Sequence, residues 1–364
     1  MLKTILMISA AVLGLALAAA LFFRCWPAFG RLPSESRRRG YAERTKYYER
    51  GRFRNSGSFV LIDRTAAKEK TAGPRRPAGK IPVIKREGLP PAGAGELAVT
   101  WFGHSTILLE LGGKNFLTDP VLSQYSSPAR GIGPKRLAEP PMTARQLPEI
   151  DLVLLSHDHF DHLDYRTIRA IDQKVKAYCV PLGVECRLEG WGVDPAKIRP
   201  MAWGDEVELD GVRITFMEGQ HFSGRSLIDQ NRTWWGGYLL RDGRHKVYFT
   251  GDTGYGAFFK RVAEKYGGLD LILTDTGQYS PRWPNSHMNP EQALQAAEDT
   301  GAAWMIPVHW AGFVLSDHGW SEPAERIYAL SQGSPVKAAV PRIGETLYFS
   351  RISEYRNPWW REVR

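Results

Sequence analysis

The segment LLSHDHFDHLD, residues 154–164, strongly constrains the fold because three histidines and three aspartates directly follow apolar residues. The preceding DLVLL, residues 151–155, is a continuous apolar run of the kind that forms a strand buried on both faces. Imidazoles and carboxylates at the end of such a strand are costly to bury unless a cation lies among them. The sequence therefore predicts a metal site where this strand ends.

The spacing within the segment suggests two ions. Alternate residues of an extended chain point to the same side, so His157 and His159 are expected to hold one ion. Asp161 and His162 follow directly and are expected to face a second ion beside the first. Nitrogen and oxygen donors of this kind suit zinc, and also manganese or iron where oxygen ligands dominate. A polar surface loop is the alternative, but it does not explain the buried strand before it.

Short strands and helices alternate from residue 96 onwards. Hairpin turns are predicted at Gly112-Gly113, at Asp210-Gly211 and near Asp242-Gly243. Apolar residues at helical spacing predict helices over residues 164–175, 257–267 and 289–301, the last of them capped by Asn289. We therefore expect an α/β domain of two sheets covered by helices over residues 96–350, followed by a C-terminal tail over residues 351–364.

Residues 1–30 contain an uncharged stretch, Thr4 to Phe23, that is long enough to cross about 30 Å of hydrocarbon as a helix. We expect an N-terminal hydrophobic helix that anchors the protein as a single span in a bacterial inner membrane. The arginines that follow it favour a cytoplasmic catalytic domain. A signal segment that is cleaved, with export of the protein, stays open as the alternative.

The positive charge of the chain is confined to its N-terminal part. Residues 31–90 carry 17 Lys and Arg against 6 Asp and Glu, whereas residues 91–364 carry 29 against 33. We expect residues 31–95 to form a basic linker that is attracted to anionic lipid head groups. The net negative charge of the remainder argues against a nucleic acid as partner.

Three later strand ends carry further metal-binding residue types. His221 in EGQHFSGR, Asp252 in YFTGDTGY and His309 in MIPVHW each follow a predicted strand. With the histidine-rich segment they resemble the signature of the metallo-β-lactamase superfamily. The segments WFGHSTILLELGGKNFLTDPVLS, GQHFSGRSLIDQNRTWWGGYLL and SHMNPEQA are similar to the N-acylphosphatidylethanolamine phospholipase D branch of that superfamily and its bacterial relatives.

The resemblance implies a four-layer αββα sandwich with two divalent ions, of which zinc is the first choice and manganese or iron the alternatives. It also implies a set of ligands: His157, His159 and His221 for the first ion, Asp161, His162 and His309 for the second, and Asp252 as the bridge between them.

Three further residues are candidates for the chemistry. The resemblance places His287 beside the substrate, and we hypothesise that it polarises a phosphoryl oxygen or protonates the leaving group. Asp161 is expected to accept a hydrogen bond from the nucleophile, and His104 is a second candidate that would reach the site from the first hairpin. Asp119 is a candidate for orienting a ligand imidazole. A structural role is the alternative for His287, His104 and Asp119.

The resemblance implies a hydrolase that cleaves N-acylphosphatidylethanolamine-type phospholipids by phospholipase D-type chemistry, and the expected anchor with its neighbouring arginines favours association with a membrane. Two neighbouring ions would lower the pKa of a shared water, and the resulting hydroxide would attack phosphorus. The same nucleophile serves a lactone, an amide, a thioester or a small phosphoester, so these substrates stay open. A non-enzymatic scaffold is a remote alternative, because it would lack ligands and no expected ligand is missing.

Tryptophans lie close in sequence to several of these elements. They either wall a groove for acyl chains or pack in the core. They are Trp101, Trp234, Trp235, Trp283 and Trp310.

Overall fold

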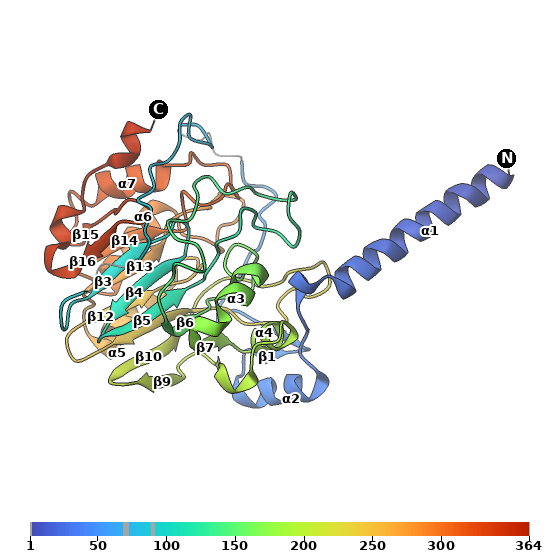
Figure 1. Ribbon diagram of the computed structural model, residues 1–364, viewed down its shortest axis with the longest axis horizontal. Coiled ribbons are helices and arrows are strands. Elements are labelled where there is room, and N and C mark those ends of the chain that lie inside the picture. Colours follow the sequence, from blue (N-terminus) through green and yellow to red (C-terminus); the bar gives the residue numbers. More distant parts are fainter. Residues whose placement is uncertain (1, 68–72, 89–91, 364) are drawn as a thin grey trace.

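The computed structural model describes residues 2–67, 73–88 and 92–363 (Figure 1). In these residues the strands form two seven-stranded sheets and one short two-stranded ribbon. The first sheet contains, in spatial order, β16 (Thr346–Tyr348), β3 (Ala98–Trp101), β4 (Ile107–Leu111), β5 (Lys114–Thr118), β6 (Ile150–Leu154), β7 (Val175–Pro181) and β8 (Ile198–Met201). The second contains β15 (Lys337–Ala338), β14 (Trp304–Val308), β13 (Leu271–Asp275), β12 (Lys246–Phe249), β11 (Gly237–Arg241), β10 (Val212–Met217) and β9 (Glu206–Leu209).

Helices cover the outer faces of the two sheets. The helices α3 (Tyr165–Ile171) and α4 (Glu185–Gly190) share one apolar cluster with the first sheet. The second sheet shares another cluster with α5 (Phe258–Tyr266), α6 (Pro290–Asp299) and α7 (Glu322–Leu330). The chain is therefore a mixed α/β fold in which the layers follow one another as helix, sheet, sheet and helix, as the sequence predicted.

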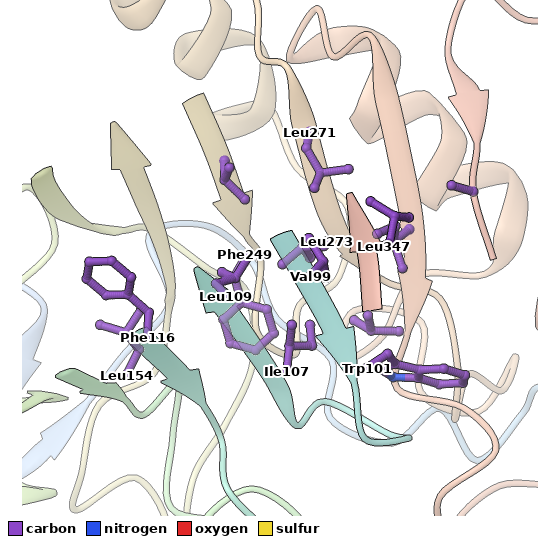
Figure 2. Packing of buried hydrophobic residues seen from close by; sticks show 14 of the residues in the cluster. Val99, Trp101, Ile107, Leu109, Phe116, Leu154, Phe249, Leu271, Leu273 and Leu347 are labelled. Atoms are coloured by element: carbon purple, nitrogen blue, oxygen red, sulfur yellow. The ribbon is translucent and has the colours of Figure 1, made fainter. Parts of the chain in front are cut away.

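The alternation of side chains along the strands separates the inner from the outer layers, because successive residues of a strand point to opposite faces. In β12, Val247 and Phe249 face the opposite sheet while Tyr248 packs against the helices. In β13, Leu271 and Leu273 point inward and Ile272 points outward. Figure 2 shows the interior cluster that the inward residues of both sheets form.

The structure has the hairpin turn predicted at Gly112-Gly113 and the helix cap predicted at Asn289. Gly112 and Gly113 join β4 to β5 with φ of 58° and 71°, a conformation that residues with a Cβ rarely adopt. Asn289 caps α6: its side chain accepts a hydrogen bond from the Gln292 N–H, and the Gln292 side chain accepts one from the Asn289 N–H. These elements are therefore fixed by local chemistry.

The N-terminal segment forms the helix α1 (Leu2–Cys25), which projects away from the sheets (Figure 1). Across the part of the chain that the structure describes, no helix combines the length and the apolar character that a membrane span requires. The expected membrane anchor is therefore not supported.

Much of the segment expected to be a basic linker, residues 31–95, packs on the domain. It contains α2 (Glu35–Arg44), β1 (Tyr48–Glu49) and β2 (Arg52–Phe53). Its buried aromatic residues Tyr41, Tyr48 and Phe53 pack with Trp234 and Trp235 of the catalytic region. Its basic residues also form ion pairs with the domain, such as Arg44 with Asp205 at 2.5 Å and Arg37 with Glu189 at 2.8 Å. The packing of this segment on the domain could not be predicted from the sequence, because a few isolated aromatic residues in a polar segment form no periodic pattern.

The expected C-terminal tail, residues 351–364, also belongs to the domain. Trp359 and Trp360 lie in the interior cluster and are 1% and 3% exposed. The Trp359 ring stacks on Trp310 with 5.7 Å between the ring centroids, and its indole N–H donates to the Val340 carbonyl over 3.1 Å. The end of the chain therefore closes one edge of the core.

We expect Trp359→Ala to lower the free energy of unfolding by about 3–5 kcal/mol, because it leaves a cavity and removes the stacking on Trp310. Chemical denaturation followed by circular dichroism measures this change. Ile132→Ala, at a residue that is 62% exposed, is the control and should shift the free energy by less than about 0.5 kcal/mol. A Trp359→Ala protein as stable as this control would contradict the assignment of the tail to the core.

Candidate metal centre

Strand ends from both sheets bring the predicted site residues to one edge of the sandwich. The loop carrying His157 follows β6 of the first sheet, and His221 follows β10 of the second. Asp252 and His309 follow β12 and β14, which lie parallel on either side of β13. Parallel strands end at the same edge of a sheet, so residues far apart in sequence meet there.

One oxygen of Asp252 is the meeting point of four imidazoles. Asp252 Oδ2 lies 3.0 Å from His162 Nε2 and 3.3 Å from His309 Nε2. The same oxygen lies 3.7 Å from His157 Nε2 and 3.8 Å from His221 Nε2. Asp252 Oδ1 is buried and has no hydrogen-bond partner in the described residues. The side chain is therefore placed between two groups of donors, with one oxygen still unsatisfied.

The first group consists of His157, His159 and His221, whose ligand atoms lie within 4.8 Å of one another. The His159 Nδ1 atom is 2.9 Å from His157 Nε2 and 3.3 Å from His221 Nε2.

The second group contains Asp161, His162 and His309. Asp161 Oδ2 lies 3.2 Å from His162 Nε2 and 3.4 Å from His309 Nε2. The structure thus brings all seven residues of the expected ligand set together.

The electrostatics of these groups fit divalent cations. Burial lowers the pKa of His157 and of His221 well below the usual histidine value, so both rings favour the neutral form that binds a metal. Burial opposes ionisation of Asp252, but His162 and His309 hold the pKa of its carboxyl well below the usual range. Although both rings are buried, the carboxylates around them raise the pKa of His162 well above the usual histidine value and that of His309 to about 10. Divalent cations would take the place of the protons on these two rings, and histidine nitrogens with a carboxylate oxygen are donors that zinc accepts.

Asp119 lies directly behind the second group. Its Oδ2 is 2.8 Å from His162 Nδ1, and its Oδ1 accepts a hydrogen bond from the Ser156 N–H over 2.7 Å. A carboxylate on Nδ1 leaves Nε2 of His162 as the free nitrogen that points to the centre. Asp119 therefore has the contacts expected of a residue that orients a ligand imidazole.

Asp275, the last residue of β13, plays a similar part that the sequence analysis missed. Its Oδ1 lies 3.1 Å from His309 Nδ1, and its Oδ2 lies 3.0 Å from His287 Nδ1. The available signal in the sequence was an aspartate at the end of the apolar run LILTD. The structure pairs Asp275 with Val308, which immediately precedes His309.

His104 lies next to the centre and outside the pocket that adjoins it. Its ring is fully buried, and its Nε2 is 2.9 Å from Asp161 Oδ2. Burial lowers the pKa of His104 to about 3, so a neutral ring that donates to Asp161 fits this position. A Cβ on Gly312 would lie only 2.4 Å from the His104 Cβ, so the chain needs glycine there. The geometry therefore suits His104 to holding Asp161 in place.

Several residues of the centre have a left-handed backbone. The φ angles of His104, Asp119 and His309 are 57°, 35° and 67°. Non-glycine residues rarely adopt such angles, and the surrounding structure must hold them there. Three of the eight non-glycine residues with a left-handed backbone in the described part of the chain thus lie at the centre.

His287 occupies a different position, on the wall of an open pocket beside the centre. Its Nδ1 is bonded to Asp275, and its ring lies 4.9 Å from the His309 ring. The pocket has a volume of about 300 Å³. It is lined by Leu61, Ile62, His159, Asp161, Phe222, Asp252, Gln278, Trp283, Ser286, His287, His309 and Leu315.

A buried ion network fixes the loop that carries the first histidines. Asp158, between His157 and His159, accepts hydrogen bonds from Arg187 over 3.2 and 3.0 Å. Arg187 also pairs with Asp229 at 2.7 Å, and Asp158 accepts from the Gly224 N–H over 2.8 Å. The network ties the loop of His157 to the loop that follows His221, and nothing in the local sequence indicated it.

Asn55, from the segment expected to be a linker, contacts His221 directly. Its side-chain N–H donates to the His221 carbonyl over 2.8 Å, and its Oδ1 accepts from the His221 N–H over 3.0 Å. The Trp235 indole N–H donates to the same Oδ1 over 3.1 Å. The backbone of a candidate ligand is therefore held by a residue far earlier in the chain.

The tryptophans divide between core and pocket. Of the five tryptophans that the sequence places near site residues, Trp283 alone lines the pocket beside the centre. The other four are buried at 1% exposure or less and belong to apolar clusters: Trp101, Trp234, Trp235 and Trp310.

Comparison with known proteins agrees with this geometry. The family described as "Beta-lactamase superfamily domain" matches residues 114–310. The chain is 40% identical to an uncharacterised protein of Mycobacterium tuberculosis, over 79% of this chain and 77% of that protein. It is 34% identical to the N-acyl-phosphatidylethanolamine-hydrolyzing phospholipase D 1 of Caenorhabditis elegans, over 64% of this chain and 69% of that protein. A crystal structure of a possible metal-dependent hydrolase from Veillonella parvula shares the fold, with a TM-score of 0.55 at 18% identity over 69% of this chain and 99% of that one.

Asn55→Ala should weaken metal binding by about 10- to 100-fold at the site of His157, His159 and His221, because His221 loses both backbone hydrogen bonds. Zinc titration against a chelator measures the affinity. Asn115→Ala is the matched control, because the Asn115 side chain donates to the Glu149 carbonyl on an exposed hairpin. Equal zinc affinity in the two variants would show that Asn55 does not support the centre.

Proposed function

Because this chain is a metal-dependent hydrolase of the metallo-β-lactamase superfamily, we propose that it cleaves a phosphodiester bond of an N-acylphosphatidylethanolamine-type phospholipid, as a phospholipase D does. The observation that carries the proposal is the open pocket in which His159, Asp161 and Asp252 meet an apolar wall. A substrate with a polar ester and a hydrocarbon part matches such a pocket. The similarity to the nematode N-acyl-phosphatidylethanolamine-hydrolyzing enzyme supports the same choice.

We propose two divalent ions, zinc first, with His157, His159 and His221 around one and Asp161, His162 and His309 around the other. The placement of Asp252 between the two groups supports its role as the bridge. When bound, such a pair of ions supplies a nucleophile from water at neutral pH and neutralises charge on the phosphoryl oxygens.

The residues of the chain would then position the reacting groups. Asp161 faces the pocket, and its Oδ2 is held by His104, so it can accept a hydrogen bond from the attacking water. The water oxygen bonds to phosphorus, the P–O bond to the head-group alcohol breaks, and the alcohol oxygen takes up a proton. His287 lines the same pocket, and with Nδ1 bonded to Asp275 it can present Nε2 to that oxygen.

A second candidate is the hydrolysis of an uncharged ester, thioester or lactone. Among the residues that the structure describes, neither lysine nor arginine lines the pocket, although these residues usually balance the charge of a phosphate. In a phosphodiester reaction the metal ions would have to compensate the negative charge of the phosphate, whereas an uncharged substrate requires no such compensation.

The zinc-loaded protein should hydrolyse N-acylphosphatidylethanolamine and bis-p-nitrophenyl phosphate faster than a lactone. His221→Ala should abolish turnover, since it removes a donor from the first group. His245→Ala, in the turn between β11 and β12, is the control and should keep turnover and metal. Mass spectrometry of the lipid products and metal analysis of each variant are the measurements. Cleavage of the lactone alone would reject the phosphodiesterase in favour of the second candidate.

Replacing His287 with glutamine should separate its role as an acid from a structural role. If His287 protonates the leaving alcohol, His287→Gln should lower kcat about 10²- to 10⁴-fold for an alkyl alcohol leaving group. Activity should change little for p-nitrophenol, which leaves without a proton. A loss of the same size for both leaving groups would indicate that His287 only supports the centre.

A further inference from the structure

Residues 55–63 form a strap that crosses the rim of the metal centre. Asn55 holds the backbone of His221, and the Ser58 carbonyl accepts a hydrogen bond from the Gln220 side chain over 3.1 Å. Further along, the Val60 N–H donates to Asn285 Oδ1 over 2.9 Å, and the Asp63 N–H donates to the Arg282 carbonyl over 2.8 Å. The strap is therefore fastened at both ends, to the loop of His221 and to the loop of His287.

Between these attachments the strap presents two aliphatic side chains to the pocket. Leu61 and Ile62 line it together with Phe222, Trp283 and Leu315. Ile62 is 49% exposed, although it sits against this apolar wall. Covering that surface with a hydrocarbon chain would remove it from water and stabilise the complex.

The rest of the pocket determines how a ligand would lie. The candidate metal ligands His159, Asp161 and Asp252 form its polar end, and the pocket holds about 300 Å³. The lining residues in the described part of the chain include neither lysine nor arginine, so these residues offer no counter-charge to a second anionic group at the apolar end. A ligand with one anionic end and one hydrocarbon end matches both parts.

We propose that the strap forms an apolar subsite for a hydrocarbon chain of the substrate, and that Leu61 and Ile62 determine which chain length it accepts. The proposal rests on the proposed function only in placing the ester at the metal centre. The strap lies outside residues 114–310, which match the superfamily, so the N-terminal segment adds Leu61 and Ile62 to a pocket whose other apolar residues come from the domain.

Binding of n-alkylphosphonates from methyl to octyl tests the subsite without requiring turnover. Isothermal titration calorimetry on the zinc-loaded protein measures each Kd. In the wild type, Kd should fall about fourfold for each methylene, equivalent to about 0.8 kcal/mol, until the pocket is filled. A wild type with no dependence on chain length overturns the proposal.

The double variant Leu61→Ala, Ile62→Ala should reduce this gain to less than about twofold per methylene and keep the Kd of methylphosphonate within about twofold of the wild type. Val60→Ala is the matched control, because Val60 belongs to the strap, is 44% exposed and does not line the pocket. This control should reproduce the wild-type series. An unchanged gain in the double variant overturns the proposal. An equal loss at every length, methyl included, overturns it as well, because the strap would then act through the metal centre.

Ile62→Trp provides the opposite change. The larger tryptophan side chain should fill part of the subsite. The gain in affinity per methylene should therefore end at an alkyl chain about two or more methylenes shorter than in the wild type. The Kd of methylphosphonate should stay unchanged. Thermal unfolding of each variant checks that the fold is kept. A series identical to the wild type would show that Ile62 does not face the ligand.

Hydrolysis of a matching series of alkyl p-nitrophenyl phosphates separates the subsite from the proposed function. Binding that depends on chain length, without any hydrolysis, would reject the phosphodiesterase and leave the subsite standing. Hydrolysis of the whole series without any dependence of binding on chain length would reject the subsite and leave the phosphodiesterase standing.

Discussion

The convergence of imidazoles on Asp252 is the constraint on which the rest of the structure depends. Four imidazole nitrogens lie within 3.8 Å of one carboxylate oxygen in a buried site. Such a cluster is costly to desolvate unless cations compensate it. The fold therefore has to deliver donors from both sheets to one point, and it does so through loops that all leave strand ends at the same edge.

Around this point lies a layer of residues whose side chains hold the donors. Asp119 bonds the Nδ1 atom of His162, and Asp275 bonds those of His309 and His287, which leaves the Nε2 atoms of His162 and His309 for the centre. Asn55 holds the backbone of His221. Arg187, between Asp158 and Asp229, joins two of the loops through buried ion pairs. Loops are mobile in general, and these contacts explain how loops can keep donors in a fixed geometry.

The centre is polar on one side and apolar on the other. Toward the sheets, the donors contact the carboxylates that orient them. Toward solvent, they open into a pocket whose wall combines the strap with Phe222, Trp283 and Leu315. The chemistry of the centre is common to many bonds, so selectivity has to come from this wall. A segment that precedes the strands of the two sheets thus has the position to influence which substrate reaches the centre.

From local signals the sequence by itself determined the buried strand β6, the hairpin turns and the capped helix α6, because apolar runs, glycine turns and capping residues are read within a few residues of each other. The set of residues that now lie together at the centre was implied by donors at strand ends together with the resemblance to a known family. Tertiary structure alone decided the strap, the packing of Trp359 on Trp310, and the contacts of Asn55 with His221 and of Asp275 with His309. The contact of Asn55 with His221 spans 166 residues, and a single hydrogen-bonded pair at that separation leaves no pattern in the chain. Local chemistry can specify an element, but the meeting of two distant elements depends on how the whole core packs.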